Sequence, residues 1–245
     1  MNTEKGIIRK AAQVGLKQVD EKDLAKINQM ALRTLTAEEV FVFKLAMCDN
    51  EIDRTHEAFT AKTLTQLAAL YVGRTIIADH ERSTHNQCAR IFDTEVISAA
   101  GQTGIGETYS QLVAHCYMLR NPGTEAMIAD IEGGIKKEVS VGCRIGAAVC
   151  SVCGTDNVKT WCDHIPGKDY DGEKCHFLLE GAKDAYEVSF VAVPAQPRAG
   201  VIKAYGAQPP AGTDEPDPET EKNEELAERQ LELNLAAAFL SSTDV

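Results

Sequence analysis

The chain has 245 residues, 44% of them hydrophobic, and a formal net charge of −12, which suits one large domain with appendages. We find neither an apolar run of the ~20 residues that a membrane span requires nor the apolar region of a secretory signal, so we expect a soluble protein made in a cytoplasm without membrane association. Residues 208–245 contain ten acidic and two basic residues, so −8 of the charge lies there and −4 in the other 207 residues, which opposes a nucleic-acid-binding surface.

The sequence predicts an α+β domain in which strands outnumber helices. Helices are indicated by apolar residues that recur every three or four positions, and strands by runs of β-branched and aromatic residues. In chain order the predicted elements are a helix at 20–35, a strand at 39–48, a helix at 58–71, strands at 75–78, 88–98 and 107–119, a helix at 126–131, and strands at 137–146 and 186–194.

Composition divides the chain into three parts. Residues 1–37 form an N-terminal helical extension, residues 38–204 contain all the predicted strands, and residues 205–245 are an acidic linker followed by a short helix at 224–239. The linker has too few apolar residues to build a core, so we expect it to be disordered. A cysteine-rich segment, residues 148–178, separates the last two strands and is called the Cys/His insert below.

The Cys/His insert has the spacing of a metal site. Cys150 and Cys153 form a C-x2-C knuckle, and Cys162 and His164 are two residues apart, which places both side chains on one side of an extended chain. Together they give three sulfurs and one nitrogen, a set that suits tetrahedral zinc. Cys175 is a fifth candidate that can replace His164. We therefore predict a closed, structural zinc site; two unrelated groups of cysteines in a loop are the alternative.

Three other side chains are of the types that hydrolytic chemistry requires. Ser140 lies within a predicted strand, and its local pattern alone favours an ordinary polar residue on a half-exposed strand. His80 directly follows an apolar strand and can act as a base, although a surface histidine is the simpler interpretation. His85 is a nearby rival, whereas the apolar surroundings of His115 are more typical of a satisfied core or strand residue. Glu187 opens the last strand, where a carboxylate can orient a histidine or simply be solvated.

Three segments, taken in order, resemble the tailed-phage prohead (head maturation) serine proteases, a family distantly similar in fold to the herpesvirus assemblins. They are LAMCDNEIDRTHEAFTAKTLTQLAALYVGRTIIADH, KKEVSVGCRIG and AYEVSFVAVPAQPRAG. The resemblance covers residues 38 to 203. The insert, with its motifs CSVCG, CDHIPG and DGEKC, also looks like one found in a subset of these phage proteases.

The resemblance implies a mainly antiparallel β-barrel flanked by helices, with Ser140 as nucleophile and His80 as general base. In assemblins the third member of the triad is a histidine that opens the next core strand. Here that position is occupied by Glu187, which departs from the assemblin pattern but can still orient an imidazole. By position, the resemblance also places the oxyanion hole in the backbone near residues 195–198.

The resemblance further implies an endopeptidase that processes the scaffold and the major capsid protein. The reaction would take place in the host cytoplasm, inside the assembling procapsid, where the protease is expected to self-associate. The alternative is a non-enzymatic capsid assembly scaffold with the same fold. A zinc-ribbon module that binds nucleic acid is opposed by the nearly neutral body and the acidic tail.

Overall fold

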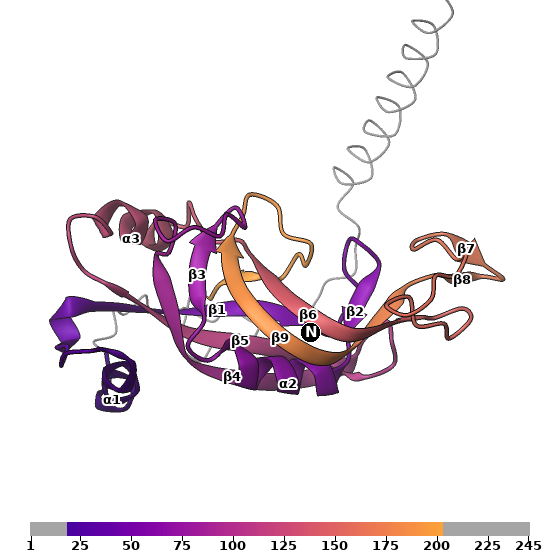
Figure 1. The fold of residues 1–245 in the computed structure, drawn as a ribbon, viewed down its shortest axis with the longest axis horizontal. Helices are drawn as coiled ribbons and strands as arrows, with labels where there is room; N and C mark the ends of the chain where they lie inside the picture. The colour runs from indigo at the N-terminus through magenta and orange to yellow at the C-terminus, as the bar shows by residue number, and fades with distance from the viewer. Residues whose placement is uncertain (1–18, 203–245) are drawn as a thin grey trace, which may run out of the picture. The chain divides into compact units, whose positions relative to one another are not determined.

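The computed structural model describes residues 19–202 (Figure 1). The predictions for residues 1–18 and for the linker and helix at 205–245 lie outside the described residues. Within them, strands predominate over three α-helices and one 3-10 turn at Ala37–Glu39, so the α+β class is confirmed.

Eight strands form one mixed sheet. They are β1 (Val40–Asp49), β2 (Glu57–Phe59), β3 (Thr75–Ala78), β4 (Ala89–Gln102), β5 (Thr108–Leu119), β6 (Val139–Cys150), β9 (Phe177–Phe190) and β10 (Gly200–Val201). Their order is β10-β1-β5-β4-β3-β9-β2, and β6 pairs with β9 off this path. The short strands β7 (Asp169–Tyr170) and β8 (Glu173–Lys174) form a separate hairpin inside the Cys/His insert.

The sheet is not closed, so the predicted barrel is wrong. β10, the strand that would close a ring, is two residues long and pairs with β1 through Leu45 and Ala46. Its only ladder contact towards β6, within residues 19–202, is an isolated bridge between Glu138 and Gly200. So short a strand offers too few hydrogen bonds to join two neighbours continuously. Most pairs are antiparallel, as predicted, but β9 pairs in parallel with β2 and β3.

β9 is the strand that brings distant parts of the chain together. One of its edges pairs with β6 from Phe177 to Phe190, while its other edge pairs with β2 near the beginning and with β3 near the end. Figure 1 shows β6 and β9 curving side by side towards the insert. The sequence predicts this strand only from residue 186, so most of its length goes unrecognised.

The first helix, α1 (Glu21–Met30), is shorter than predicted. It begins at Asp20, whose side chain accepts the N–H of Asp23 at 2.8 Å. It ends before residue 35 because Asn28 uses its carboxamide to bind the backbone of Leu35, with the Leu35 N–H at 2.7 Å from Oδ1. The intervening residues are therefore held out of helical geometry.

Helix α2 (Ala61–Tyr71) packs against β4, β5 and β9 and closes the main core. Its predicted beginning, residues 58–59, instead belongs to β2, and Thr60 caps the helix. Helix α3 (Glu125–Glu132) follows β5, close to the predicted position. The largest fully buried apolar side chains in the described part of the chain are Tyr71, Ile27, Leu45, Met47, Leu64, Leu67, Ile76, Ile77, Ile91, Leu112 and Met118.

Candidate active site and metal centre

The turn after β3 holds His80 in an unusual backbone conformation. Asp79 and His80 have φ values of 51° and 54°, in the left-handed region that costs an ordinary residue about 1–2 kcal/mol. The turn is fixed by an N–H of Asp79 that donates to the carbonyl of Phe190 at 2.9 Å. Asn86 also donates to the carbonyls of Ala78 and Glu81, at 2.7 and 2.9 Å. Such strain in a well-anchored turn is typical of functional positions.

His80 and Glu187 form the central pair of the site. The imidazole Nδ1 lies 2.9 Å from Oε1 of Glu187. The carboxylate is 1% exposed, whereas the histidine side chain is 43% exposed. With Nδ1–H donating to the carboxylate, Nε2 of the neutral ring carries the free lone pair, which is the arrangement that a general base requires.

Gly142 provides the space for this carboxylate. In the β6–β9 register Gly142 lies opposite Glu187, and a Cβ built on Gly142 would overlap Oε1 of Glu187. The carboxylate therefore lies over β6, in the volume that any larger residue would fill. The hydroxyl of Tyr71 donates to the carbonyl of Gly142 at 3.1 Å, which fixes the backbone at this point.

Ser140 lies on the same face of the sheet as the His80–Glu187 pair. It is two residues before Gly142, so both positions face the same side of β6. It lies directly opposite Ser189 of β9, whose Oγ accepts the backbone N–H of His80 at 2.7 Å. Ser140 is half-buried. Among the described residues no hydrogen bond joins Ser140 to His80. Catalytic hydrogen bonds often form only when substrate binds, so this absence does not exclude the pair.

Residues 191–199 include the positions 195–198 implied to form the oxyanion hole, and this segment begins and ends next to Ser140. At its start the N–H of Val191 donates to the carbonyl of Glu138 at 3.1 Å, and at its end Ala199 accepts from Val139 at 3.4 Å. Between them Gln196 is anchored through its side chain to the backbone of β1. Both ends of residues 191–199 thus meet the two residues before Ser140.

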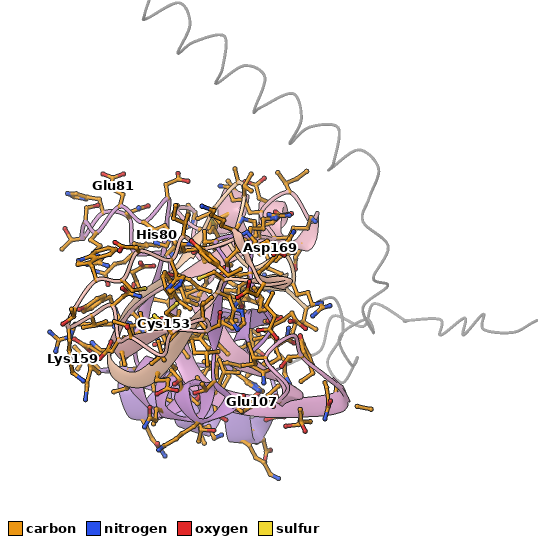
Figure 2. All side chains as sticks on the ribbon, turned by 90° about the vertical axis from the view of Figure 1, so that its right-hand side faces the viewer. His80, Glu81, Glu107, Cys153, Lys159 and Asp169 are labelled. Carbon is orange, nitrogen blue, oxygen red and sulfur yellow. The ribbon has the colours of Figure 1, made fainter. Side chains whose placement is uncertain are left out.

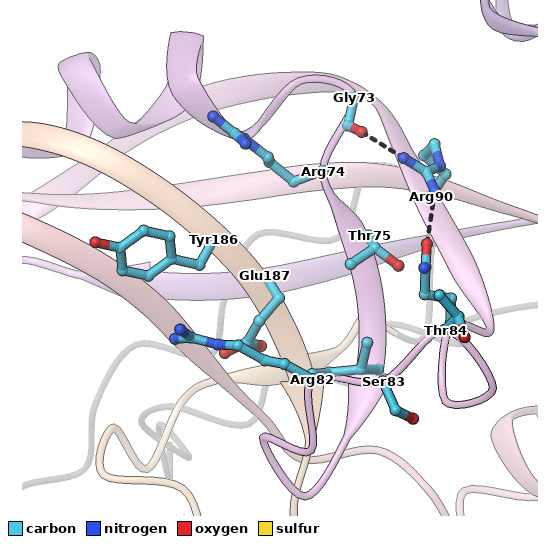
Figure 3. Close-up of a pocket in the computed structure, with 11 residues that line it drawn as sticks. Gly73, Arg74, Thr75, Arg82, Ser83, Thr84, Arg90, Tyr186 and Glu187 are labelled. Carbon is cyan, nitrogen blue, oxygen red and sulfur yellow. Dashed lines mark hydrogen bonds between the residues drawn. The ribbon is translucent and has the colours of Figure 1, made fainter.

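A cavity of about 370 Å³ adjoins Glu187 (Figure 3). Arg82 stacks on the ring of Tyr186, with 4.6 Å from Cζ to the ring centroid, and Figure 3 shows it beside Glu187. The lining residues are Gly73, Arg74, Thr75, Ile77, Arg82, Ser83, Thr84, Gln87, Arg90, Tyr186 and Glu187. The cavity therefore lies between β3, β9 and the loop that follows His80, and neither His80 nor Ser140 is among the residues that line it.

His85 and His115 are placed differently from His80. His115 lies on β5 with Nε2 2.9 Å from Oε1 of Glu95, on the β4–β5 ladder. His85 is exposed in the loop after His80. Neither His85 nor His115 contacts Ser140 or Glu187 through a hydrogen bond in the described part of the chain.

Four residues of the Cys/His insert converge and could hold a metal ion. The ligand atoms of Cys150, Cys153, Cys162 and His164 all lie within 4.8 Å of one another. Cys150 ends β6 and is buried, Cys153 is exposed, and the other two are half-buried. Figure 2 views the molecule from the end that carries the insert, with Cys153 labelled.

Two observations fit a metal at this cluster. Nδ1 of His164 is buried and has no hydrogen-bond partner in the described structure, a cost that a bound cation would remove. Hydrogen bonds from Thr155 lower the pKa of the Cys153 thiol to about 6, and the carboxamide of Asn157 lowers the pKa of Cys162. Burial instead raises the pKa of Cys150 to about 11, so a metal would have to displace the proton of this thiol.

Cys175 lies beside the cluster but outside the group of four. Its sulfur is 3.8 Å from that of Cys150, and the residue is fully buried. The geometry thus brings His164 into the group of ligand atoms and leaves Cys175 as a neighbour of a single ligand.

No family model, curated protein or solved structure matches the chain. Within residues 19–202, no helix is long and apolar enough to cross a membrane. The functional reading of the chain therefore depends on the geometry of these two sites and on the motifs of the sequence.

Sequence reasoning missed three contributors to the site. Ser189 and Asn86 anchor the His80 turn, and Gly142 accommodates the carboxylate. A signal for Ser189 was present, because it lies two residues after Glu187 and so shares its face of the strand.

Proposed function

We propose that the chain is a serine endopeptidase of the prohead-maturation class, with Ser140 as nucleophile, His80 as general base and Glu187 as third member. The observation that carries the proposal is the 2.9 Å contact between His80 Nδ1 and the buried Glu187. Ser140 lies on the same face of the sheet, one strand away. A carboxylate in this place can do what the histidine of assemblins does, which is to orient the ring and stabilise its protonated form.

The chemistry follows from these positions. Nε2 of His80 takes the hydroxyl proton as Ser140 Oγ attacks the scissile carbonyl carbon, which forms a tetrahedral intermediate. The imidazolium then gives that proton to the leaving amine as the C–N bond breaks, which leaves an acyl ester on Ser140. Water, deprotonated by the same nitrogen, hydrolyses the ester and regenerates the serine. Backbone N–H groups near residues 195–198 are the proposed donors to the oxyanion.

The proposed substrates come from the sequence motifs. They are the scaffold and the major capsid protein of a tailed phage, processed inside the procapsid in the host cytoplasm, where the protease self-associates. Neither nucleic acid nor a membrane is a proposed partner.

The proposed metal is a structural zinc ion held by Cys150, Cys153, Cys162 and His164. Three sulfurs and one nitrogen match the ligand preference of zinc, and four protein ligands leave no position for a reacting water. Because the insert connects β6 with β9, the ion would order the junction between the strand of Ser140 and the strand of Glu187.

Labelling with a fluorophosphonate tests the proposed nucleophile without knowledge of the substrate. The wild-type chain should be modified at Ser140, as located by mass spectrometry of the tryptic peptides, and Ser140→Ala and His80→Ala should not react. Ser98→Ala, on β4, is the matched control and should react like the wild type. Coexpression of the wild type and of Ser140→Ala with the major capsid protein then tests proteolysis. Intact capsid protein in both cultures, with no labelling, would leave the non-enzymatic scaffold as the better proposal.

A further inference from the structure

Ser189 links the strand of the nucleophile to the turn of the base. It is fully buried in β9, between Ile77 of β3 on one edge and Ser140 of β6 on the other. Its Oγ accepts the backbone N–H of His80 at 2.7 Å. One hydroxyl therefore lies where the three strands of the site meet.

Ser189 accepts its hydrogen bond from the backbone N–H of a residue with a strained backbone. His80 and the preceding Asp79 both have positive φ, and a turn of this kind relaxes when its anchors are removed. No other acceptor for the His80 N–H is found in the described residues. Without Oγ of Ser189 this amide would be unpaired, and the turn would gain by rotating it towards solvent.

Rotation of the turn would move the imidazole away from its partner. Glu187 cannot follow, because its carboxylate is confined over Gly142 and is 1% exposed. The 2.9 Å contact between His80 and Glu187 is thus maintained from the backbone side by Ser189.

We propose that Ser189 is a positioning residue that holds the His80 turn so that the imidazole faces both Glu187 and Ser140. This inference rests on the proposed protease mechanism for its effect on rate, but the effect on the His80–Glu187 hydrogen bond is independent of any activity. Ser189 itself does not act on substrate, because it is fully buried and its oxygen is engaged with the backbone.

The test uses Ser189→Ala and Ser189→Cys in the full chain. The alanine removes the acceptor and the cysteine replaces it with a weaker one of similar size. The rate of fluorophosphonate labelling at Ser140 should fall about 10- to 100-fold in Ser189→Ala, with Ser189→Cys between it and the wild type, as expected for a small misplacement of a catalytic group. Ser110→Ala is the matched control, since Ser110 is a buried serine of β5 away from the site whose hydroxyl is also hydrogen-bonded, and it should label normally.

A second measurement does not depend on catalysis. In proton NMR spectra the Nδ1–H of His80, assigned by its absence in His80→Ala, should give a low-field signal in the wild type that is lost or broadened in Ser189→Ala. Wild-type labelling rates together with an unchanged signal would overturn the inference, and should the alanine variant fail to fold, the same comparison is decided by Ser189→Cys. Absence of labelling in the wild type would reject the proposed function, while the NMR signal still tests the position of His80.

Discussion

The carboxylate of Glu187 occupies the volume that a side chain at residue 142 would need, so Gly142 and Glu187 are two halves of one packing arrangement. Gly142 lies in an ordinary extended strand, and its lack of a Cβ is what the site requires. The short S-V-G motif of β6 therefore combines the proposed nucleophile, Ser140, with Gly142, which leaves space for the carboxylate of Glu187.

Gly142→Ala should displace Glu187 and separate it from His80. Because the carboxylate is enclosed, the added methyl group cannot be absorbed without movement, and overpacking of this kind costs about 1–3 kcal/mol. Labelling of Ser140 by a fluorophosphonate should slow by at least 10-fold. Gly123→Ala, at an exposed turn where the added methyl group would meet only the side chain of Asn121, should keep the wild-type labelling rate. A fully reactive Gly142→Ala protein would contradict the position of the carboxylate.

Glu187→Gln tests the third member of the proposed triad. A neutral amide cannot stabilise the imidazolium that forms as Ser140 loses its proton, so the reaction rate should fall by about 10²–10⁴-fold. Stability should change little, because the carboxylate already has a buried oxygen, Oε2, without a hydrogen-bond partner in the described structure. Glu180→Gln, on the exposed side of the same strand, is the control. A silent Glu187→Gln would place the third member elsewhere, with His85 and His115 as the next candidates.

The metal prediction distinguishes the two candidate fourth ligands. Elemental analysis should find one zinc per chain in the wild type and in Cys175→Ala. Loss of a residue that only hydrogen-bonds a metal ligand costs ~10–100-fold in metal affinity. His164→Ala removes a ligand itself, so it should weaken zinc binding by more than that. Chelation should increase hydrogen exchange over residues 148–178 and slow labelling of Ser140. A zinc content near zero after zinc-replete expression would refute the site. If His164→Ala kept its zinc and Cys175→Ala lost it, the fourth ligand would be Cys175.

The thiols of the metal-free insert should differ in reactivity at neutral pH. Since hydrogen bonds from Thr155 lower the pKa of Cys153 to about 6, this exposed thiol is mostly thiolate at pH 7 and becomes protonated as the pH falls through 6. Burial raises the pKa of Cys150 to about 11, so that thiol stays protonated. Iodoacetamide should therefore modify Cys153 first after chelation, with a rate that falls below pH 6. Equal rates at the two positions, or protection of Cys153 without metal, would contradict this account.

Local sequence patterns predict the parts of the fold that depend on residues close together in the sequence. The strand Thr75–Ala78 was predicted with its observed bounds, because four apolar or β-branched residues end at a polar turn. The C-x2-C and C-x-H spacings likewise placed four ligand atoms in one group.

Features that depend on distant residues were not predictable in this way. The first part of β9 contains Gly181, Lys183 and Asp184, and it is a strand because β6 pairs with it through two register shifts. β2 is three residues long and exists only through its parallel pairing with β9. The failure of the sheet to close depends on the length of β10, which no local pattern encodes.

The order of the strands also governs when the proposed protease could first act during synthesis. The turn of His80 depends on the carbonyl of Phe190 and the hydroxyl of Ser189, and Ser140 needs the same strand beside it. At roughly 5–20 residues per second, a ribosome that has made His80 works for about another 5–20 s before β9 exists. A nascent or truncated chain that stops before residue 190 therefore lacks the assembled site, and the proposed activity could appear only after β9 has been made.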